Sequence, residues 1–155
     1  MKEVTLYAFK TGNGISRKIR MWRNPHNLNI NVGDKAYLKN RNEVIEEECR
    51  YKIICDEDAT ANFAGHKYEK IKPILKKLTI LVPIEEIEID KTWQTPNKAK
   101  FEAKLKHYNE TQQFIDNIIL IKGKEKKYKL VDGYTTYLIC VNTLKQSEVK
   151  VDYFE

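Results

Sequence analysis

Short alternations of apolar and polar residues characterise the first third of the chain. In the stretch KEVTLYAF, at residues 2–9, Val4, Leu6 and Ala8 recur with the two-residue period of a half-buried β-strand. Turn-forming residues separate it from further short strands, which are predicted at residues 18–23, 35–38 and 50–54. Because short strands in quick succession favour small barrels or strongly bent sheets, we predict a small, barrel-like, β-rich module over residues 1–57.

The hydrophobic periodicity fades after this module. Residues 58–62, with the sequence DATAN, indicate an irregular connection, and residues 68–77 are typical of a short helix that Pro73 interrupts. We therefore expect residues 58–77 to form a linker or a connecting helix.

A more regular order of elements begins at Leu78. The apolar run LTILVPIEEIEI predicts an entering strand followed by a turn. Further on, Thr95-Pro96 predicts the start of a helix, because threonine is a good N-cap and proline suits the first helical position. The face of this helix that is expected to enter the core consists of Phe101, Leu105 and Tyr108. A separate stripe, placed to contact an anion, consists of Lys100, Lys104 and His107.

The last part of the chain predicts two paired strands, a helix and a final strand. Residues 115–121 are a β-branched run suited to a central strand, and the polar tip at residues 122–127 leads back into a strand at residues 128–131. A helix with an apolar face follows from Tyr134, and the alternation in EVKVDYF predicts a closing strand at residues 148–154. Residues 78–155 thus predict a mixed domain, and the whole chain predicts an α+β fold.

Positive charge suggests a polyanionic partner. The chain has 28 lysine and arginine residues against 22 acidic ones, a formal charge of +6. Such a balance suits nucleic acid, although many proteins use it only to stay soluble. Basic residues between positions 17 and 41 are interleaved with Trp22 and Tyr37, a combination that can bind a phosphate backbone and stack bases. The alternative is a solvated surface, on which these residues pair with the acidic block at residues 43–58.

The cysteines do not indicate a metal site. Cys49, Cys55 and Cys140 form no C-x-x-C pair and have no histidine at metal-ligand spacing, so neither a disulfide framework nor a zinc site is supported. We expect a reducing, cytoplasmic location and a buried structural role for Cys140. No apolar run has the length of a membrane helix, so no membrane partner is expected.

The order of elements from Leu78 to Phe154 resembles the ParB N-terminal and sulfiredoxin-like superfamily. The residues that carry the resemblance are the entrance VPIEEI at residues 82–87 and LVDGYTTYL at residues 130–138. The resemblance covers about half of the chain and implies a domain in which the segment after the glycine binds nucleotide or nucleic-acid phosphates. Thr135 and Thr136 stand where that family typically has a His-Arg or Arg-Arg pair.

The predicted site is the strand–turn–helix segment around Gly133. Backbone N–H groups at a helix start favour an anion, and glycine allows a close approach. The residues expected to bind phosphate or nucleic acid are Gly133, Tyr134, Thr135, Thr136, Lys98, Lys100, Lys104, Lys124 and Lys126. Asp132 is a weak catalytic or metal-binding candidate whose alternative role is to complete the turn. The threonines have the alternative role of capping the helix, and the lysines at the hairpin tip that of solubility.

Three functions are compatible with these features. The first is a ParB-like protein of a bacterium, phage or plasmid that binds nucleic acid or nucleotide phosphates without the family's full catalytic set. The second is a metal-dependent nuclease or nucleotide-dependent phosphotransferase of that superfamily, in which Asp132 with Glu85 or Glu86 would hold Mg²⁺ beside a nucleotide. The third is a phage-encoded inhibitor that binds a host protein and uses the fold as a scaffold.

Overall fold

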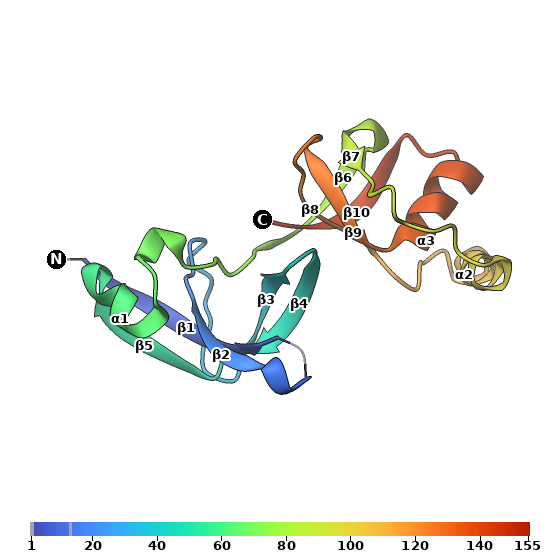
Figure 1. Cartoon of the computed structure of the whole chain (residues 1–155). Helices are drawn as coiled ribbons and strands as arrows, with labels where there is room; N and C mark the ends of the chain where they lie inside the picture. The colour runs from blue at the N-terminus through green and yellow to red at the C-terminus, as the bar shows by residue number, and fades with distance from the viewer. Residues whose placement is uncertain (1, 13) are drawn as a thin grey trace. The chain divides into compact units, whose positions relative to one another are not determined.

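The computed structural model describes residues 2–12 and 14–155. The chain divides into two compact units, an N-terminal unit of residues 1–76 and a C-terminal unit of residues 77–155 (Figure 1). Each unit contains both strands and helical segments, so the predicted α+β class is confirmed.

The N-terminal unit is built from two small antiparallel sheets. Strand β1 (Glu3–Thr11) lies between β2 (Lys18–Trp22) and β5 (Tyr51–Asp56). Strands β3 (Lys35–Asn40) and β4 (Glu43–Glu48) form a separate hairpin. The two sheets contribute to one buried apolar cluster, which consists of Phe9, Trp22, Ile30, Ala36, Leu38, Cys49 and Ile74. Short turns of 3-10 helix occur at Gly14–Ser16, Glu57–Ala59 and Tyr68–Lys70.

Strand β4 was not predicted, because its sequence EVIEEE consists mostly of glutamates. Pairing with β3 satisfies its backbone, and Ile45 packs against the apolar cluster. The acidic side chains also find partners, since Glu47 forms an ion pair with Arg17 at 3.0 Å and Glu46 one with Lys35 at 3.6 Å. Part of the acidic block therefore neutralises basic residues, as the solvated-surface interpretation proposed.

The segment that follows β5 contains one short helix, α1 (Thr60–Ala64). The helix predicted at residues 68–77 is wrong, because only Tyr68–Lys70 is helical. The chain then runs extended past Pro73, which has no N–H for a helical hydrogen bond. The Arg23 amide donates to the Lys72 carbonyl at 3.0 Å, and the Ile74 amide donates to the Arg23 carbonyl at 2.8 Å. These bonds fix the extended segment beside the end of β2.

The C-terminal unit is organised by a five-stranded mixed sheet with the order β6-β10-β8-β9-β7 (Figure 1). The strands are β6 (Lys77–Pro83), β7 (Ile87–Glu88), β8 (Ile118–Lys122), β9 (Tyr128–Asp132) and β10 (Glu148–Phe154). A 3-10 turn at Ile84–Glu86 joins β6 to β7. The predicted pairing of β8 with β9 is confirmed and antiparallel, while β10 lies parallel to β8 and antiparallel to β6.

The apolar residues of this sheet form the second core together with Cys140 from the helical turn after α3. Its buried members are Val82, Ile87, Ile118, Leu120, Tyr128, Leu130, Cys140, Val149 and Val151. The helix predicted after the glycine is α3 (Tyr134–Leu138), which continues as a π-helical turn at Ile139–Thr143. The strand predicted to start at Ile115 begins only at Ile118, and Ile115 is exposed, because residues 112–117 are used to leave the preceding helix.

Helix α2 (Lys98–Thr111) departs from its prediction in two respects. Its N-cap is Asn97, whose side-chain oxygen accepts a 2.7 Å hydrogen bond from the Lys100 amide, so the predicted cap at Thr95 is wrong. The predicted core face is also wrong, because α2 contains no buried residue. Tyr108 instead stacks on Phe114 just beyond the helix, with 4.3 Å between ring centroids. The face packs locally rather than entering a deep core.

Candidate functional site

The turn after β9 requires glycine for two separate reasons. Gly133 has φ +81°, and a Cβ at this position would lie 2.3 Å from the Asn117 carbonyl oxygen. Its amide donates a 2.8 Å hydrogen bond to Asp132 Oδ1. The close backbone approach expected at Gly133 therefore exists, but the neighbour is the chain itself. Asp132, which is exposed, completes the turn through this bond.

The two threonines that follow are buried. Thr135 is 5% exposed and Thr136 is 3% exposed. The Thr136 hydroxyl donates a 2.9 Å hydrogen bond to the Asp116 carbonyl, so it ties α3 to the segment that leads into β8. Neither threonine is the N-cap of α3, since that position is occupied by Gly133 without a side-chain bond. The predicted capping role is therefore wrong, and Thr136 instead links α3 to the preceding segment through this hydrogen bond.

A small pocket of about 140 Å³ lies beside this turn and gathers most of the predicted site. We call it the Trp93 pocket, and its lining residues are Trp93, Gln94, Pro96, Lys100, Lys104, Asp116, Asp132, Gly133, Tyr134 and Thr135. The rings of Trp93 and Tyr134 are 5.5 Å apart with a tilt of 42°, and Tyr137 stacks on Tyr134 at 6.3 Å. A partly exposed tryptophan ring thus lies tilted against a tyrosine ring beside lysine side chains.

The two lysines that line the Trp93 pocket differ in whether an acidic side chain already neutralises them. Lys104 forms an ion pair and hydrogen bond with Asp116, so its charge is already compensated. Lys100 lies one turn earlier on α2 and is exposed, and no ion pair to it occurs within the described residues. Lys100 is therefore the cation of this pocket that is most readily offered to a ligand.

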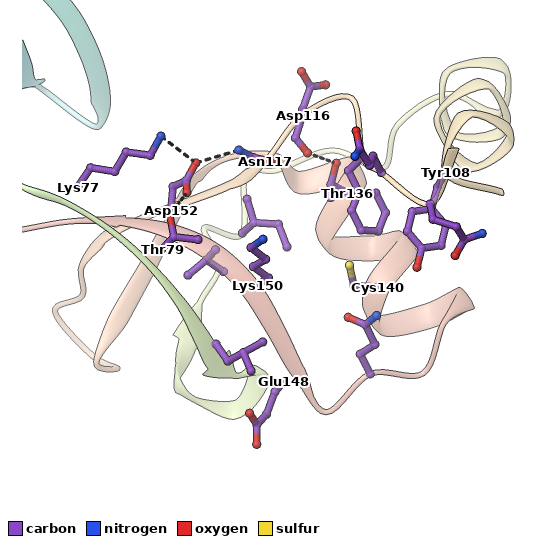
Figure 2. A pocket seen from close by; sticks show the side chains of 17 residues that line it. Lys77, Thr79, Tyr108, Asp116, Asn117, Thr136, Cys140, Glu148, Lys150 and Asp152 are labelled. Carbon is purple, nitrogen blue, oxygen red and sulfur yellow. Dashed lines mark hydrogen bonds and ion pairs between the residues drawn. The ribbon is translucent and has the colours of Figure 1, made fainter. Parts of the chain in front are cut away.

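A second and larger hollow of about 680 Å³ lies against the sheet (Figure 2). We call it the Asp152 cavity. Asp152, which is 7% exposed, accepts hydrogen bonds from the Thr79 hydroxyl at 3.0 Å and from Asn117 Nδ2 at 2.9 Å, and Lys77 Nζ lies 3.8 Å from the carboxylate. Other polar side chains around it are Tyr108, Gln112, Gln113, Asp116, Thr136, Gln146, Glu148 and Lys150. The cavity is suited to hydrogen bonding with a polar ligand.

Cys140 also lines the Asp152 cavity (Figure 2), where it is 3% exposed. Burial raises the pKa of its thiol to about 11. Because the thiolate is the nucleophilic form, a thiol that stays protonated at neutral pH is a packing residue. Burial raises the pKa of the Tyr137 hydroxyl as well.

The other predicted residues lie outside both sites. Lys98 is exposed on the first turn of α2, with Nζ 3.9 Å from Glu102. Lys124 and Lys126 are exposed on the tip between β8 and β9. Glu85 and Glu86 do not line the pocket that contains Asp132, and within residues 2–12 and 14–155 no group of three or more His, Cys, Asp or Glu side chains could hold a metal ion.

Trp93 and Asp152 were not singled out from the sequence. Trp93 stands in an irregular stretch before α2, and only its contact with Tyr134 gives it meaning. Asp152 belongs to an alternating strand in which polar residues are expected to be exposed, and its burial depends on Asn117 and Lys77 from distant positions. A tryptophan beside a predicted helix start was the one sequence signal available.

Comparisons of the chain with protein-family models, curated proteins and solved structures found no match in any of the three. Among the helices of the described part of the chain, none combines the length and apolar character needed to cross a membrane.

Proposed function

We propose that this chain is a ParB-like protein that binds nucleic acid, with the Trp93 pocket as the contact for an unpaired base and its phosphate. The supporting observation is the pair of rings, Trp93 and Tyr134, 5.5 Å apart beside the exposed Lys100. Stacking of a base on an aromatic ring contributes about 1–3 kcal/mol and tolerates any base. A nearby lysine adds attraction to the phosphate backbone.

Binding rather than catalysis is the better proposal for this site. Asp132 accepts a hydrogen bond from the Gly133 amide, which is a turn-completing role. Thr136 is hydrogen bonded within the chain, and threonine lacks the forked, permanent charge with which arginine holds a phosphate. The aromatic rings and Lys100 remain as the groups that face a ligand, and they support affinity without supplying an acid, a base or a nucleophile.

The charge pattern favours a single strand over a duplex. Around the pocket, Lys104 and Asp116 neutralise each other, so stacking contributes more than charge at this point. Bases in a duplex are stacked on one another and do not offer their faces to protein rings. An unpaired base in a single strand can insert its face against Trp93, which is 36% exposed. The overall charge of +6 would assist the approach of either polymer.

Titration of a fluorescently labelled, single-stranded oligonucleotide, followed by anisotropy over a range of salt concentrations, tests the proposal. Lys100→Glu and Trp93→Ala should each weaken binding about tenfold, within the range expected for a lost stacking or phosphate contact. Lys106→Glu is the matched control, because Lys106 lies on the same helix, is exposed, and does not line the pocket. Phe63→Ala is the control for Trp93→Ala, because it removes an exposed aromatic ring from the N-terminal unit and should leave binding unchanged.

The proposal fails if wild-type affinity is absent or does not fall with salt. It also fails if Lys106→Glu weakens binding as strongly as Lys100→Glu, because attraction would then be a property of the whole surface. A duplex of the same sequence is expected to bind more weakly than the single strand.

The Asp152 cavity favours a second function, the binding of a small polar molecule. Seven of its twelve polar or charged side chains are amides or hydroxyls, and Lys77 is already engaged by Asp152. A thermal-shift screen of uncharged polar compounds, nucleosides among them, tests this, because a ligand of the folded state raises the melting temperature. Absence of any shift from such compounds would remove this function.

A further inference from the structure

The N-terminal unit contains a basic hollow that the functions above do not use. It has two adjoining parts of about 300 and 340 Å³, which share Trp22, Arg41 and Lys72. The first part is completed by Lys39, Pro73 and Leu75, and the second by Thr11, Gly12, Arg20 and Asn40. Four cations and no acidic residue line the two parts together, so the hollow has a uniformly positive character.

Trp22, which lines both parts of this hollow, has an indole N–H without a hydrogen-bond partner. Trp22 is 3% exposed, and its Nε1 is the one side-chain nitrogen or oxygen in residues 2–12 and 14–155 that is fully shielded from solvent and has no hydrogen-bond partner. Buried polar groups are nearly always paired, so an unpaired indole N–H points to a missing acceptor. Lys72 Nζ lies over the same ring, 5.9 Å from its centroid.

The four cations are exposed, and the guanidinium of one of them, Arg20, is held by uncharged acceptors. Arg20 donates two 2.9 Å hydrogen bonds to Thr11, one to its carbonyl and one to its hydroxyl, and both acceptors are uncharged. The Lys72 backbone is fixed by the bond from the Arg23 amide. Within the described residues, no ion pair involves Arg20, Lys39, Arg41 or Lys72. Other cations of this unit, such as Arg17 and Lys35, do have acidic partners.

From this arrangement we propose that the hollow binds the phosphate group of a small organic phosphate. Two guanidinium groups suit the planar pairs of oxygens that a phosphate presents, and two ammonium groups add point charges. Phosphate is favoured over a carboxylate because a monoester carries up to two negative charges at neutral pH, which matches four cations better than one charge does. Pro73, Leu75 and the Trp22 ring give the organic part of the ligand an apolar wall.

The indole signals of the intact chain test this inference directly. The chain has two tryptophans, so a ¹H–¹⁵N spectrum contains two indole N–H signals, and Trp93→Phe assigns them. Phenyl phosphate is the probe, added at constant ionic strength, with phenylacetate as the carboxylate comparison. The Trp22 signal should move and saturate with phenyl phosphate, and phenylacetate should bind at least tenfold more weakly.

Substitutions separate this site from general charge. Lys72→Gln and Arg41→Gln should each weaken the binding of phenyl phosphate at least tenfold. Lys52→Gln is the matched control, because Lys52 also lies over a ring in this unit, 5.6 Å from the Tyr7 centroid, and does not line the hollow. An unmoved Trp22 signal, or equal losses from Lys52→Gln and Lys72→Gln, would overturn the proposal. Trp93→Phe leaves the hollow intact, so failure of nucleic-acid binding at the Trp93 pocket does not affect this result.

Discussion

Thr79 and Asp152 face each other across strands β6 and β10, and the threonine hydroxyl donates a 3.0 Å hydrogen bond to the aspartate. The same carboxylate accepts from Asn117 and lies near Lys77, so one side chain joins β6, β10 and the start of β8. It is a buried charge that is compensated from three sides.

Asp152→Ala should therefore destabilise the C-terminal unit by about 2 kcal/mol, because it leaves the Asn117 and Thr79 donors without their acceptor. Asp152→Asn keeps one acceptor and should lose less. Urea unfolding followed by Trp93 fluorescence measures both. Lys150→Ala, an exposed position on the same strand, is the control and should change the free energy of unfolding by less than about 0.5 kcal/mol. Equal losses from Asp152→Ala and Lys150→Ala would contradict the role of the carboxylate.

Gly133→Ala should cost about 3 kcal/mol or more. The new Cβ would lie 2.3 Å from the Asn117 carbonyl oxygen, which is backbone and cannot swing away, and the positive φ adds strain. Gly65→Ala separates the two effects, because Gly65 has φ +73° with nothing within 4 Å of the added Cβ. Gly65→Ala should lower the free energy of unfolding by only about 1 kcal/mol, which is the effect of the backbone conformation alone. Thermal unfolding of both variants makes the comparison. Similar losses of stability would show that the close approach of the new Cβ to the Asn117 carbonyl is unimportant.

Thr136→Val should destabilise the chain by about 1 kcal/mol, since valine keeps the shape but loses the hydroxyl that donates to the Asp116 carbonyl at 2.9 Å. Thr135→Val is the matched control at an equally buried neighbour whose hydroxyl makes no hydrogen bond within the described residues. It should be nearly neutral. Chemical unfolding of the two variants distinguishes a packing role from a hydrogen-bonding role. If Thr135→Val lowers the free energy of unfolding as much as Thr136→Val does, the hydrogen-bonding role of Thr136 is contradicted.

Stability should fall between pH 9 and pH 11 because of Cys140. Burial raises the pKa of this thiol from 9.0 to about 11 in the folded state. Over that range the unfolded chain releases the proton while the folded chain keeps it, so the unfolded state binds fewer protons and becomes relatively more favourable. The wild type should lose about 2 kcal/mol more than Cys140→Ala across this range, from about 1.4 kcal/mol per pH unit. Urea unfolding at each pH measures this difference. If the free energy of unfolding falls equally with pH in the wild type and in Cys140→Ala, the thiol makes no such contribution.

Strands with regular alternation could be predicted well from the sequence. The closing strand at residues 148–154 has the predicted bounds, and the first strand at residues 2–9 differs by one or two residues at its ends. Strand β4 could not be predicted, because a run of glutamates lacks β propensity and its pairing depends on β3 and on ion pairs with Arg17 and Lys35. Tertiary contacts there outweigh local preference.

The candidate site could be predicted where neighbours in sequence are also neighbours in space. Asp132, Gly133, Tyr134 and Thr135 share one turn, Lys100 and Lys104 share one helix face, and these six residues line one pocket. The other residues expected to bind phosphate do not line it; they are Thr136, Lys98, Lys124 and Lys126. That any of them binds phosphate stays a prediction. What those residues do was harder to predict. The burial of the threonines depends on the loop before β8, and the contact of Trp93 with Tyr134 joins residues that no periodicity relates.

Strand β10 lies in the middle of its sheet although it is the last strand in the chain, with β6 on one side and β8 on the other. During synthesis, β6 and β8 therefore emerge with open edges and no shared neighbour until residues 148–154 are made. An edge left open in this way is a template for pairing with another chain. Pairing of these seven residues with both neighbours closes the two open edges.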